Sequence, residues 1–413
     1  YTDRYLTIPA SVKEMGEGVF YGASGLTMVD VSANIAELPA KTFEFTALKS
    51  VKLSGTITKL GDRSFSYTDF ETLDLTGSAV RELGNYVFSY MYKLESISLP
   101  ALTKIGAFTF YYAPDPTFDG APDYYPLKSV SLAEGTTVLG DAMFYSLSGF
   151  PYLTEIKLPN SVKNNVTVIG DMTFSGCSAV RSLNLGALTK AGDYAFASCK
   201  ALETLDLNSL TEIGDSAFRN CESLKFSDLS KVTRIGNRAL ANTSIESVNL
   251  VSCEYIGERA FSNTKLKTLN GLVKAKTIGA YAFENTALEG TFTLPATIAG
   301  ERTAIGRGIL IGTKVSKIAL AGNNPVYYVK DGILFSTLEN GSAQLELCPP
   351  EYDAKEYIVP AGTVRIQDDA FRSVTKLEKV TMSKEIAAIG DKAFYGCSAK
   401  EYVFPGLTAP ILE

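Results

Sequence analysis

Residues 202–221 read LETLDLNSLTEIGDSAFRNC, and variants of this block recur along the chain. The glycine of its IG step repeats at an interval of 21 or 22 residues, at Gly170, Gly192, Gly214, Gly236, Gly257 and Gly279. Upstream, nearly the same interval separates Gly61, Gly84 and Gly106. A fixed period of roughly 20–29 residues built on spaced leucines is typical of stacked repeats. The sequence therefore predicts a solenoid.

Each repeat contains the signals of one strand and one corner. Leu205 and Leu207 alternate with polar residues, which is the pattern of a short, half-buried strand. Gly214 suits a tight turn, and Asp215 suits the N-cap of a brief helical turn, where its side chain accepts a backbone N–H. We therefore expect a β-rich α/β solenoid, wound as a right-handed superhelix, with one short strand and one helical turn per coil of 22–23 residues.

The end of the repeat predicts how the coils pack. A phenylalanine recurs after the corner, and stacked coils would bring these rings into one internal ladder, formed by Phe65, Phe88, Phe110, Phe144, Phe174, Phe196 and Phe218. Cys177, Cys199 and Cys221 follow three residues after the ring, where other coils have threonine, alanine or valine. Because cysteine behaves as a small apolar residue when it is buried, we expect free thiols.

The combination of L-x-x-L-x-L with L-T-x-I-G-x-x-A-F-x-x-C resembles the BspA-like class of bacterial leucine-rich repeat surface proteins. The resemblance extends from LTIPASVKEMGEGVF near the start of the chain to IAAIGDKAFYGC near its end. It implies a leucine-rich repeat solenoid in a protein that is exported or attached to the bacterial surface. It also implies adhesion or binding to host proteins, and it brings no shared catalytic motif.

Breaks in the period predict the domain organisation. Residues 1–320 would form the solenoid, with a loop insertion at 111–126. Residues 321–360 contain the turn signals Asp331-Gly332 and Asn340-Gly341 and predict a β-hairpin interruption, whose plainer role is a spacer. Residues 361–413 would continue the repeats and are truncated at the C-terminus.

The insertion at 111–126 is the candidate ligand-binding loop. It is rich in aromatic and acidic residues and lacks lysine and arginine. Its rings could form a platform and its carboxylates could accept from a cation or a sugar hydroxyl, at Tyr111, Tyr112, Asp115, Phe118, Asp119, Asp123, Tyr124 and Tyr125. Alternatively, the tyrosines pack over their own coil. The outward strand positions are small and polar, so that face either binds an extended partner or is simply solvated.

Composition narrows the function. The chain has no histidine, which removes the usual general base of nucleophilic triads and the histidine-containing zinc sites. Its formal net charge of −6 gives no basic footprint for nucleic acid, and no apolar run approaches the ~18 residues of a membrane span. We expect no catalytic residue, no cofactor and no metal. Because the chain begins with Tyr1, we expect a signal peptide or lipid anchor to lie outside this segment.

Three functions remain open. The first is a non-enzymatic extracellular or cell-surface adhesion protein, which presents a curved repeat sheet and the 111–126 loop to a host or bacterial protein or a glycan. The second is a carbohydrate-binding or carbohydrate-active solenoid, which for cleavage would need a convergent pair of carboxylates. The third is a structural spacer for another domain.

Overall fold

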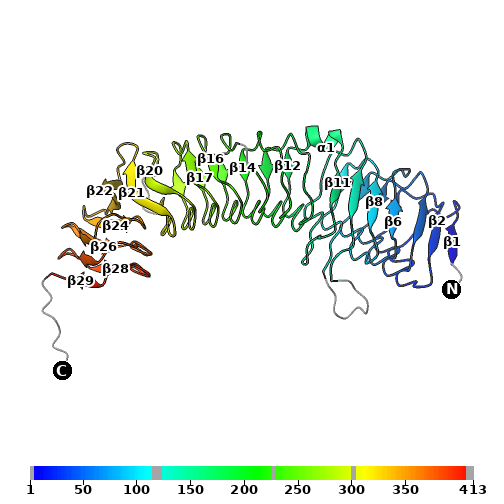
Figure 1. Ribbon diagram of the computed structural model, residues 1–413. Coiled ribbons are helices and arrows are strands. Elements are labelled where there is room, and N and C mark those ends of the chain that lie inside the picture. Colours follow the sequence, from blue (N-terminus) through cyan, green and yellow to red (C-terminus); the bar gives the residue numbers. More distant parts are fainter. Residues whose placement is uncertain (1–3, 114–122, 226–227, 299–303, 406–413) are drawn as a thin grey trace, which may run out of the picture. The chain divides into compact units, whose positions relative to one another are not determined.

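The computed structural model describes residues 4–113, 123–225, 228–298 and 304–405 of the 413-residue chain. Residues 1–227 form one compact unit and residues 228–413 form a second, called here the N-terminal and C-terminal units (Figure 1). Each unit is a stack of coils in which most equivalent strands of successive coils pair in parallel. The predicted β-solenoid is therefore present in both units.

Two rows of strands line the N-terminal unit. Row A contains the longer strands, β1 (Tyr5–Ile8), β2 (Met28–Val31), β4 (Ser50–Leu53), β6 (Thr72–Asp74), β8 (Ser96–Leu99), β10 (Ser129–Leu132) and β11 (Glu155–Lys157). Row B contains two-residue strands, which from β5 onward end just before the glycine of the corner. They are β3 (Glu37–Leu38), β5 (Lys59–Leu60), β7 (Glu82–Leu83), β9 (Lys104–Ile105), β12 (Val168–Ile169), β13 (Lys190–Ala191) and β14 (Glu212–Ile213). The prediction of one strand per coil is therefore incomplete, because it missed row B.

The C-terminal unit repeats this plan. Its row A strands are β16 (Ser247–Asn249), β18 (Thr268–Asn270), β20 (Glu289–Leu294), β21 (Lys314–Leu320), β25 (Glu356–Ile358), β27 (Lys379–Thr381) and β29 (Glu401–Val403). Its row B strands are β15 (Arg234–Ile235), β17 (Tyr255–Ile256), β19 (Thr277–Ile278), β26 (Thr363–Ile366) and β28 (Ala388–Ile389).

Antiparallel strands interrupt the C-terminal unit between residues 327 and 347. Strands β22 (Tyr327–Lys330), β23 (Ile333–Thr337) and β24 (Ala343–Leu347) form two hairpins. The first turns at Asp331-Gly332, where both residues have positive φ, as expected for a two-residue hairpin turn. Strand β24 then pairs in parallel with β26, so the hairpins join the sheet of row B.

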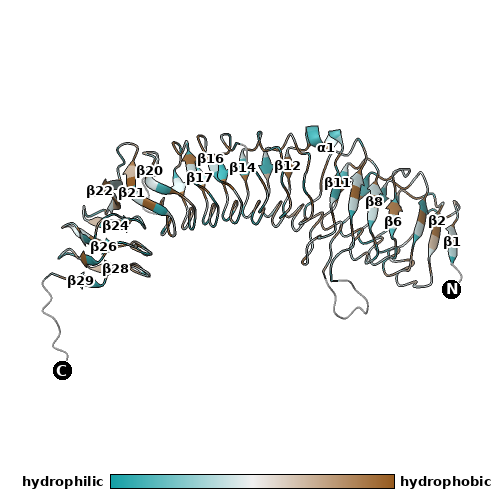
Figure 2. Ribbon diagram, viewed as in Figure 1, coloured by the Kyte–Doolittle hydropathy of each residue, from teal (hydrophilic) through white to brown (hydrophobic). Residues whose placement is uncertain are grey.

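The core of each unit lies between the two rows. Hydrophobic and hydrophilic residues are interleaved along the strands (Figure 2). In β10, for example, Val130 and Leu132 are buried and alternate with half-exposed serines. The predicted phenylalanine ladder is confirmed. Its rings are buried and stack with centroid separations of 5.1–6.2 Å from Phe43 through Phe218.

The predicted helical turn at each corner is not confirmed. Among the described residues the only helix is α1 (Asn160–Asn165), which belongs to a spacing irregularity and not to the repeat. The corners contain turns with two residues of positive φ, two positions before and two positions after the buried phenylalanine, for example Tyr194 and Ser198 around Phe196. A left-handed residue cannot continue a right-handed helix, so the chain turns instead.

The glycine and aspartate of the corner act between coils. A Cβ on Gly61 would lie 2.6 Å from the backbone nitrogen of Ala40 in the preceding coil, so glycine is required by close approach of the backbones. Asp171 accepts a hydrogen bond from the N–H of Asp193, and Asp193 accepts one from Asp215, both at 2.8 Å. The predicted N-cap within one coil is therefore wrong, because the donor is the equivalent residue of the next coil.

The six cysteines are free, which confirms the sequence prediction. Cys199 and Cys221 donate hydrogen bonds of 3.1 Å to the carbonyl oxygens of Phe174 and Phe196, which belong to neighbouring coils. Burial raises the pKa of Cys199 to about 12, so its thiol stays protonated and remains a donor. These thiols are packing groups.

Replacing Phe196 by alanine tests the ladder. Its ring is fully buried between those of Phe174 and Phe218, so we expect Phe196→Ala to lower the free energy of unfolding by about 3–5 kcal/mol. The measurement is urea denaturation followed by circular dichroism. Tyr194→Ala is the matched control, because its side chain is 40% exposed in the same coil. Equal stability of the two variants would contradict the ladder.

Candidate functional site: an aromatic groove in the N-terminal unit

Three coils differ from most others in the residue at one corner position, two residues after the phenylalanine of the ladder. Two residues after the phenylalanine or leucine of the ladder, φ is positive in most described coils, although not at Tyr112 or Ser146. Most coils with positive φ place a small or amide residue there, namely Gly22, Gly176, Ser198, Asn220, Asn242, Asn263, Asn285, Gly312, Ser373 and Gly396. Glycine and asparagine tolerate this conformation, whereas a bulky side chain is strained. Phe45, Tyr67 and Tyr90 occupy it in three successive coils. We name these three rings the aromatic row.

The aromatic row is a continuous stack. The ring centroids of Phe45 and Tyr67 lie 4.1 Å apart, and those of Tyr67 and Tyr90 lie 4.4 Å apart, with nearly parallel planes. Tyr21 and Tyr111 close the two ends edge-on, each with a centroid separation of 5.5 Å. Because the rings cover one another's faces, the row presents ring edges to its surroundings.

The aromatic row is one wall of a groove of about 650 Å³. Lys41 and Arg63 lie along the groove beside the row, and Glu44, Ser66 and Ser89 line it as well. The serines hold the position that Tyr21 and Tyr111 hold in the flanking coils, directly after the buried phenylalanine. Small residues between bulky ones therefore create the hollow. We call it the aromatic groove.

Charges in the aromatic groove are balanced. The Glu44 side chain is only 3% exposed, and its nearest cation is Arg63, with 3.9 Å between Oε1 and Nη1. Burial raises the pKa of Glu44, and Arg63 opposes this rise. Lys41 forms an ion pair of 2.7 Å with Glu17, and this hydrogen bond raises the pKa of Lys41. The groove thus combines donors, acceptors and apolar edges.

Two of the tyrosines predicted to contact a ligand lie in the core. Tyr112 and Tyr125 are fully buried and stack with their centroids 5.4 Å apart. The Tyr125 hydroxyl donates a hydrogen bond of 2.8 Å to the carbonyl oxygen of Phe88. Burial raises the pKa of Tyr112 to about 12, the negative charge of Asp123 adding to this, so its hydroxyl is neutral at physiological pH. Both side chains therefore pack in the core of the solenoid at the two ends of the insertion.

The other predicted loop residues have different places. Tyr111 joins the end of the aromatic row, whereas Asp123 is exposed and Tyr124 is 44% exposed beside Tyr152. Asp115, Phe118 and Asp119 lie outside the described residues. Ligand binding by the 111–126 loop stays a prediction, and the structure brings Tyr111 and Tyr112 of this set into ring contact with Tyr90 of the aromatic row.

The aromatic row was missed in the sequence, although the signal was present. Aligning the repeats on the buried phenylalanine shows aromatic residues at 45, 67, 90 and 112, where the other coils have glycine, serine or asparagine. Without the backbone angles, nothing marks this column as left-handed.

Comparison with protein families places the chain. The model of the BspA type leucine-rich repeat region matches residues 4–115, 141–267, 235–304 and 351–411, in six copies. The chain belongs to the BspA-type leucine-rich repeat family. The comparison with curated proteins found no match.

Solved structures similar to this BspA-type chain include three bacterial proteins. A leucine-rich repeat protein from Bacteroides ovatus ATCC 8483 is 19% identical, with 96% of this chain and 86% of that one covered and a TM-score of 0.47. A leucine-rich cell surface protein from Faecalibacterium prausnitzii A2-165 is 21% identical (81% and 70% covered, TM-score 0.41). The pneumococcal vaccine antigen PcpA is 18% identical (81% and 60% covered, TM-score 0.37).

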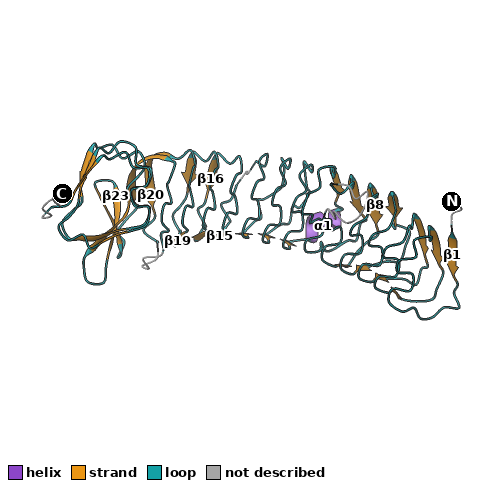
Figure 3. Cartoon of the chain, turned by 90° about the horizontal axis from the view of Figure 1, so that it is seen from below, coloured by secondary structure: helices purple, strands orange, loops and turns teal. Residues whose placement is uncertain are grey.

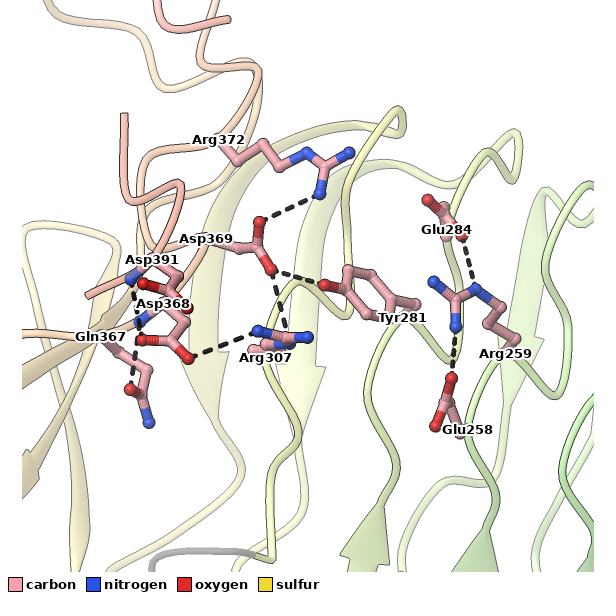
Figure 4. A network of polar contacts seen from close by, with 10 residues as sticks. All are labelled: Glu258, Arg259, Tyr281, Glu284, Arg307, Gln367, Asp368, Asp369, Arg372 and Asp391. Carbon is pink, nitrogen blue, oxygen red and sulfur yellow. Dashed lines mark hydrogen bonds and ion pairs between the residues drawn. The ribbon is translucent and has the colours of Figure 1, made fainter. Parts of the chain in front are cut away.

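The C-terminal unit of the BspA-type chain contains a second polar cluster, centred on Asp369 (Figure 4). Its carboxylate is 1% exposed and accepts hydrogen bonds from the Tyr281 hydroxyl at 2.6 Å and from Arg372 at 3.0 Å. Arg307 adds an ion pair of 3.7 Å, and Arg259 stacks on the Tyr281 ring at 4.3 Å. The carboxylate is thus fully engaged by its neighbours.

This cluster spans the hairpin interruption. Tyr281 and Asp369 are 88 residues apart in sequence, and strands β22, β23 and β24 lie between them. The cluster joins a coil that precedes the hairpins to a coil that follows them. Its role is therefore structural. No group of three or more histidine, cysteine, aspartate or glutamate side chains in the described ranges is placed to hold a metal ion. No helix there is long and apolar enough to cross a membrane.

Removal of the Asp369 carboxylate should destabilise the C-terminal unit. Asp369→Ala leaves two arginines and a tyrosine hydroxyl without their buried acceptor, so we expect the free energy of unfolding to fall by about 3–5 kcal/mol. Urea denaturation checks this. Asp353→Ala is the control, since that side chain is 88% exposed and also belongs to an ion pair. A loss no larger than the control's would contradict the structural role.

Alkaline pH should weaken the same cluster. Burial, followed by the hydrogen bond to Asp369, raises the pKa of Tyr281 above its ordinary value. The stability that the neutral hydroxyl contributes is therefore complete below the unfolded-state pKa of about 10 and is lost as the pH rises through the folded-state pKa. We expect the melting temperature of the wild type to fall more steeply than that of Tyr281→Phe above about pH 10. Parallel curves would contradict this.

Proposed function

We propose that this BspA-type protein is a non-enzymatic binding or adhesion protein of the bacterial exterior, and that it binds a protein or a glycan through the aromatic groove. The supporting observation is the aromatic row. Three successive coils accept bulky rings at left-handed positions, where most of the other coils use glycine, serine or asparagine. Local rules are typically broken at functional sites, where the strain is retained for binding.

The chemistry of the aromatic groove supports binding more than catalysis. Tyrosine and arginine are the residues that most often dominate the binding energy of protein interfaces. Tyrosine also gives a large contact area with little loss of conformational entropy. Glu44 and Glu17 are the carboxylates among the described residues that line this groove. Glu17 is 59% exposed and forms an ion pair with Lys41, an arrangement that does not favour the paired acid and base of glycoside hydrolysis. Family membership supports a location outside the cell, because BspA-like proteins are typically exported or surface-attached.

The 111–126 loop remains a second candidate contact. Its exposed Asp123 and Tyr124 supply an acceptor and a ring, and Tyr111 connects the loop to the aromatic row. Deleting the whole loop would be a poor test, because Tyr112 and Tyr125 are core residues. The informative loop variant is Asp123→Ala/Tyr124→Ala, which leaves the buried pair in place.

Replacing the aromatic row by asparagine separates function from stability. In Phe45→Asn/Tyr67→Asn/Tyr90→Asn, each position receives a residue that other coils use. The relief of backbone strain, roughly 1–2 kcal/mol per residue, offsets the lost ring stacking of about 0.5–1.5 kcal/mol per pair. We expect a folded protein whose binding to a glycan array or a panel of extracellular-matrix proteins is lost. Surface plasmon resonance against each hit measures the loss.

The control is Tyr194→Asn/Tyr395→Asn, which removes two exposed rings outside the aromatic groove. Retained binding in this control and in the loop variant would assign the site to the aromatic row. Binding that is lost only in the loop variant would move the site to residues 123 and 124. Depolymerisation of a glycan would support the carbohydrate-active alternative, and wild-type protein that binds no array member would support a spacer.

A further inference from the structure

Row A of the C-terminal unit is interrupted between two neighbouring coils. Strands β16 and β18 pair in parallel from Ser247 and Thr268 onward, and β20 pairs with β21 (Figure 3). In the part of the chain that the structure describes, no pairing joins β18 to β20. Row B continues through the same coils, because β17 pairs with β19 and Ile278 bridges to Ile305. The coils are therefore stacked on one side and open on the other.

Two glycines explain the opening. Gly271 ends β18 and Gly290 lies near the start of β20, and both have a φ of 71°. The pairing of β20 with β21 also shifts register between Gly290 and Thr291. A bulge of this kind bends a strand and redirects its edge. Here it turns β20 toward β21 and leaves a seam beside β18.

Backbone groups point into the seam from both sides. The Thr268 N–H donates to the carbonyl oxygen of Glu246, so alternation along the strand turns the N–H and C=O of Leu269 away from β16 and toward β20. The carbonyl oxygen of Leu294 accepts from the N–H of Ala321, so the same alternation turns Thr293 away from β21. The structure describes no hydrogen bond between the two edges.

The seam is hollow and apolar at its base. A groove of about 380 Å³ lies between the strands, and we call it the seam groove. Its apolar lining comes from β18, the turn after it, and β20 and β21, namely Leu269, Leu272, Val273, Leu288, Phe292 and Val315. Val273 is 54% exposed at its rim. An apolar side chain that entered from outside would therefore find apolar contacts.

Charges across the seam are also unmatched. Elsewhere, lysine and glutamate of successive coils pair at a similar spacing, as in Lys276 with Glu254 at 2.7 Å. Lys267 and Glu289 both line the seam groove and are separated by the same 22 residues, but the described residues show no ion pair between them. The seam thus offers one cation and one anion beside two open strand edges.

We propose that the seam groove is a docking site for an extended peptide segment of a partner protein, added as a strand between β18 and β20. Only another polypeptide backbone supplies donors and acceptors in the alternation that a strand edge requires. Apolar side chains of the peptide would enter the seam groove on one face. An acidic and a basic residue of the peptide would meet Lys267 and Glu289, which line the same groove. This site is separate from the aromatic groove and does not depend on it.

A segment of this chain is a suitable probe. Residues 376–383, KLEKVTMS, contain β27, which lies in parallel between β25 and β29 and buries Val380 and Met382. The peptide also carries neighbouring acidic and basic residues. A fluorescein-labelled copy should bind the whole protein with saturable anisotropy. The same peptide N-methylated at Val380 and Met382 lacks two backbone donors and should bind at least roughly tenfold more weakly.

Two matched variants locate the binding site. Val273→Asp places a charge at the rim of the seam groove, and we expect it to weaken peptide binding roughly tenfold or more. Val251→Asp is the control, because Val251 is the exposed valine of the preceding coil and does not line the groove. Equal effects of the two substitutions, or equal binding of the N-methylated peptide, would overturn the proposal.

Hydrogen exchange tests the seam in the free protein. The amides of Leu269 and Thr293 should exchange rapidly. Those of Thr268 and Leu250 should be protected, because they donate hydrogen bonds to the carbonyl oxygens of Glu246 and Asn270. Saturating peptide should slow exchange at Leu269 and Thr293. Slow exchange at these two amides in the free protein would mean that the seam is closed, and unchanged exchange with peptide would mean that it is not a strand site. Either result would overturn the proposal.

Discussion

Contact between equivalent residues of successive coils is the interaction on which the whole structure depends. A typical coil hydrogen-bonds its backbone to its neighbours, stacks its phenylalanine on the next ring, and accepts a backbone N–H with the aspartate of its corner. No coil has a core of its own, so stability arises between coils. A side chain therefore lies in a column, formed by the residues at the equivalent position of successive coils. The contacts that it makes depend on which residues occupy the rest of that column.

Columns also explain what the sequence could and could not predict. The period, the inward leucines, the phenylalanine ladder and the buried thiols follow from one repeat, because each requires only that like residues stack. The partner of Asp193 could not be assigned in this way, since an N–H of its own corner and one of the next coil are equally close in sequence. The positive φ values at the corner could not be predicted from the sequence either. For that reason the sequence predicted a helical turn that is absent, and it did not mark the aromatic row.

The loop at 111–126 shows the limit of composition as a guide to function. Five aromatic residues in an insertion resemble a binding platform, yet Tyr112 and Tyr125 are buried and fasten the loop to the coils. The difference lies in which column a ring can join. Tyr111 falls beside Tyr90 and extends an existing stack, whereas Tyr125 reaches the carbonyl oxygen of Phe88 inside the core. The sequence gives the type of each residue, but its neighbours are known only when the register between successive coils is known.

Irregularities in a solenoid fall into two kinds, and this chain contains both. At the hairpins the array is interrupted, but the buried Asp369 carboxylate bonds Tyr281 and Arg372 and pairs with Arg307, which joins the coils on the two sides. At the aromatic row and at the seam, no such repair exists. Ring edges, a carboxylate that accepts no hydrogen bond in the described part of the chain, and two unpaired strand edges stay available. Polar groups in an open groove bond to water, so these sites cost little free energy in the free protein and can accept a partner's donors and acceptors in place of that water.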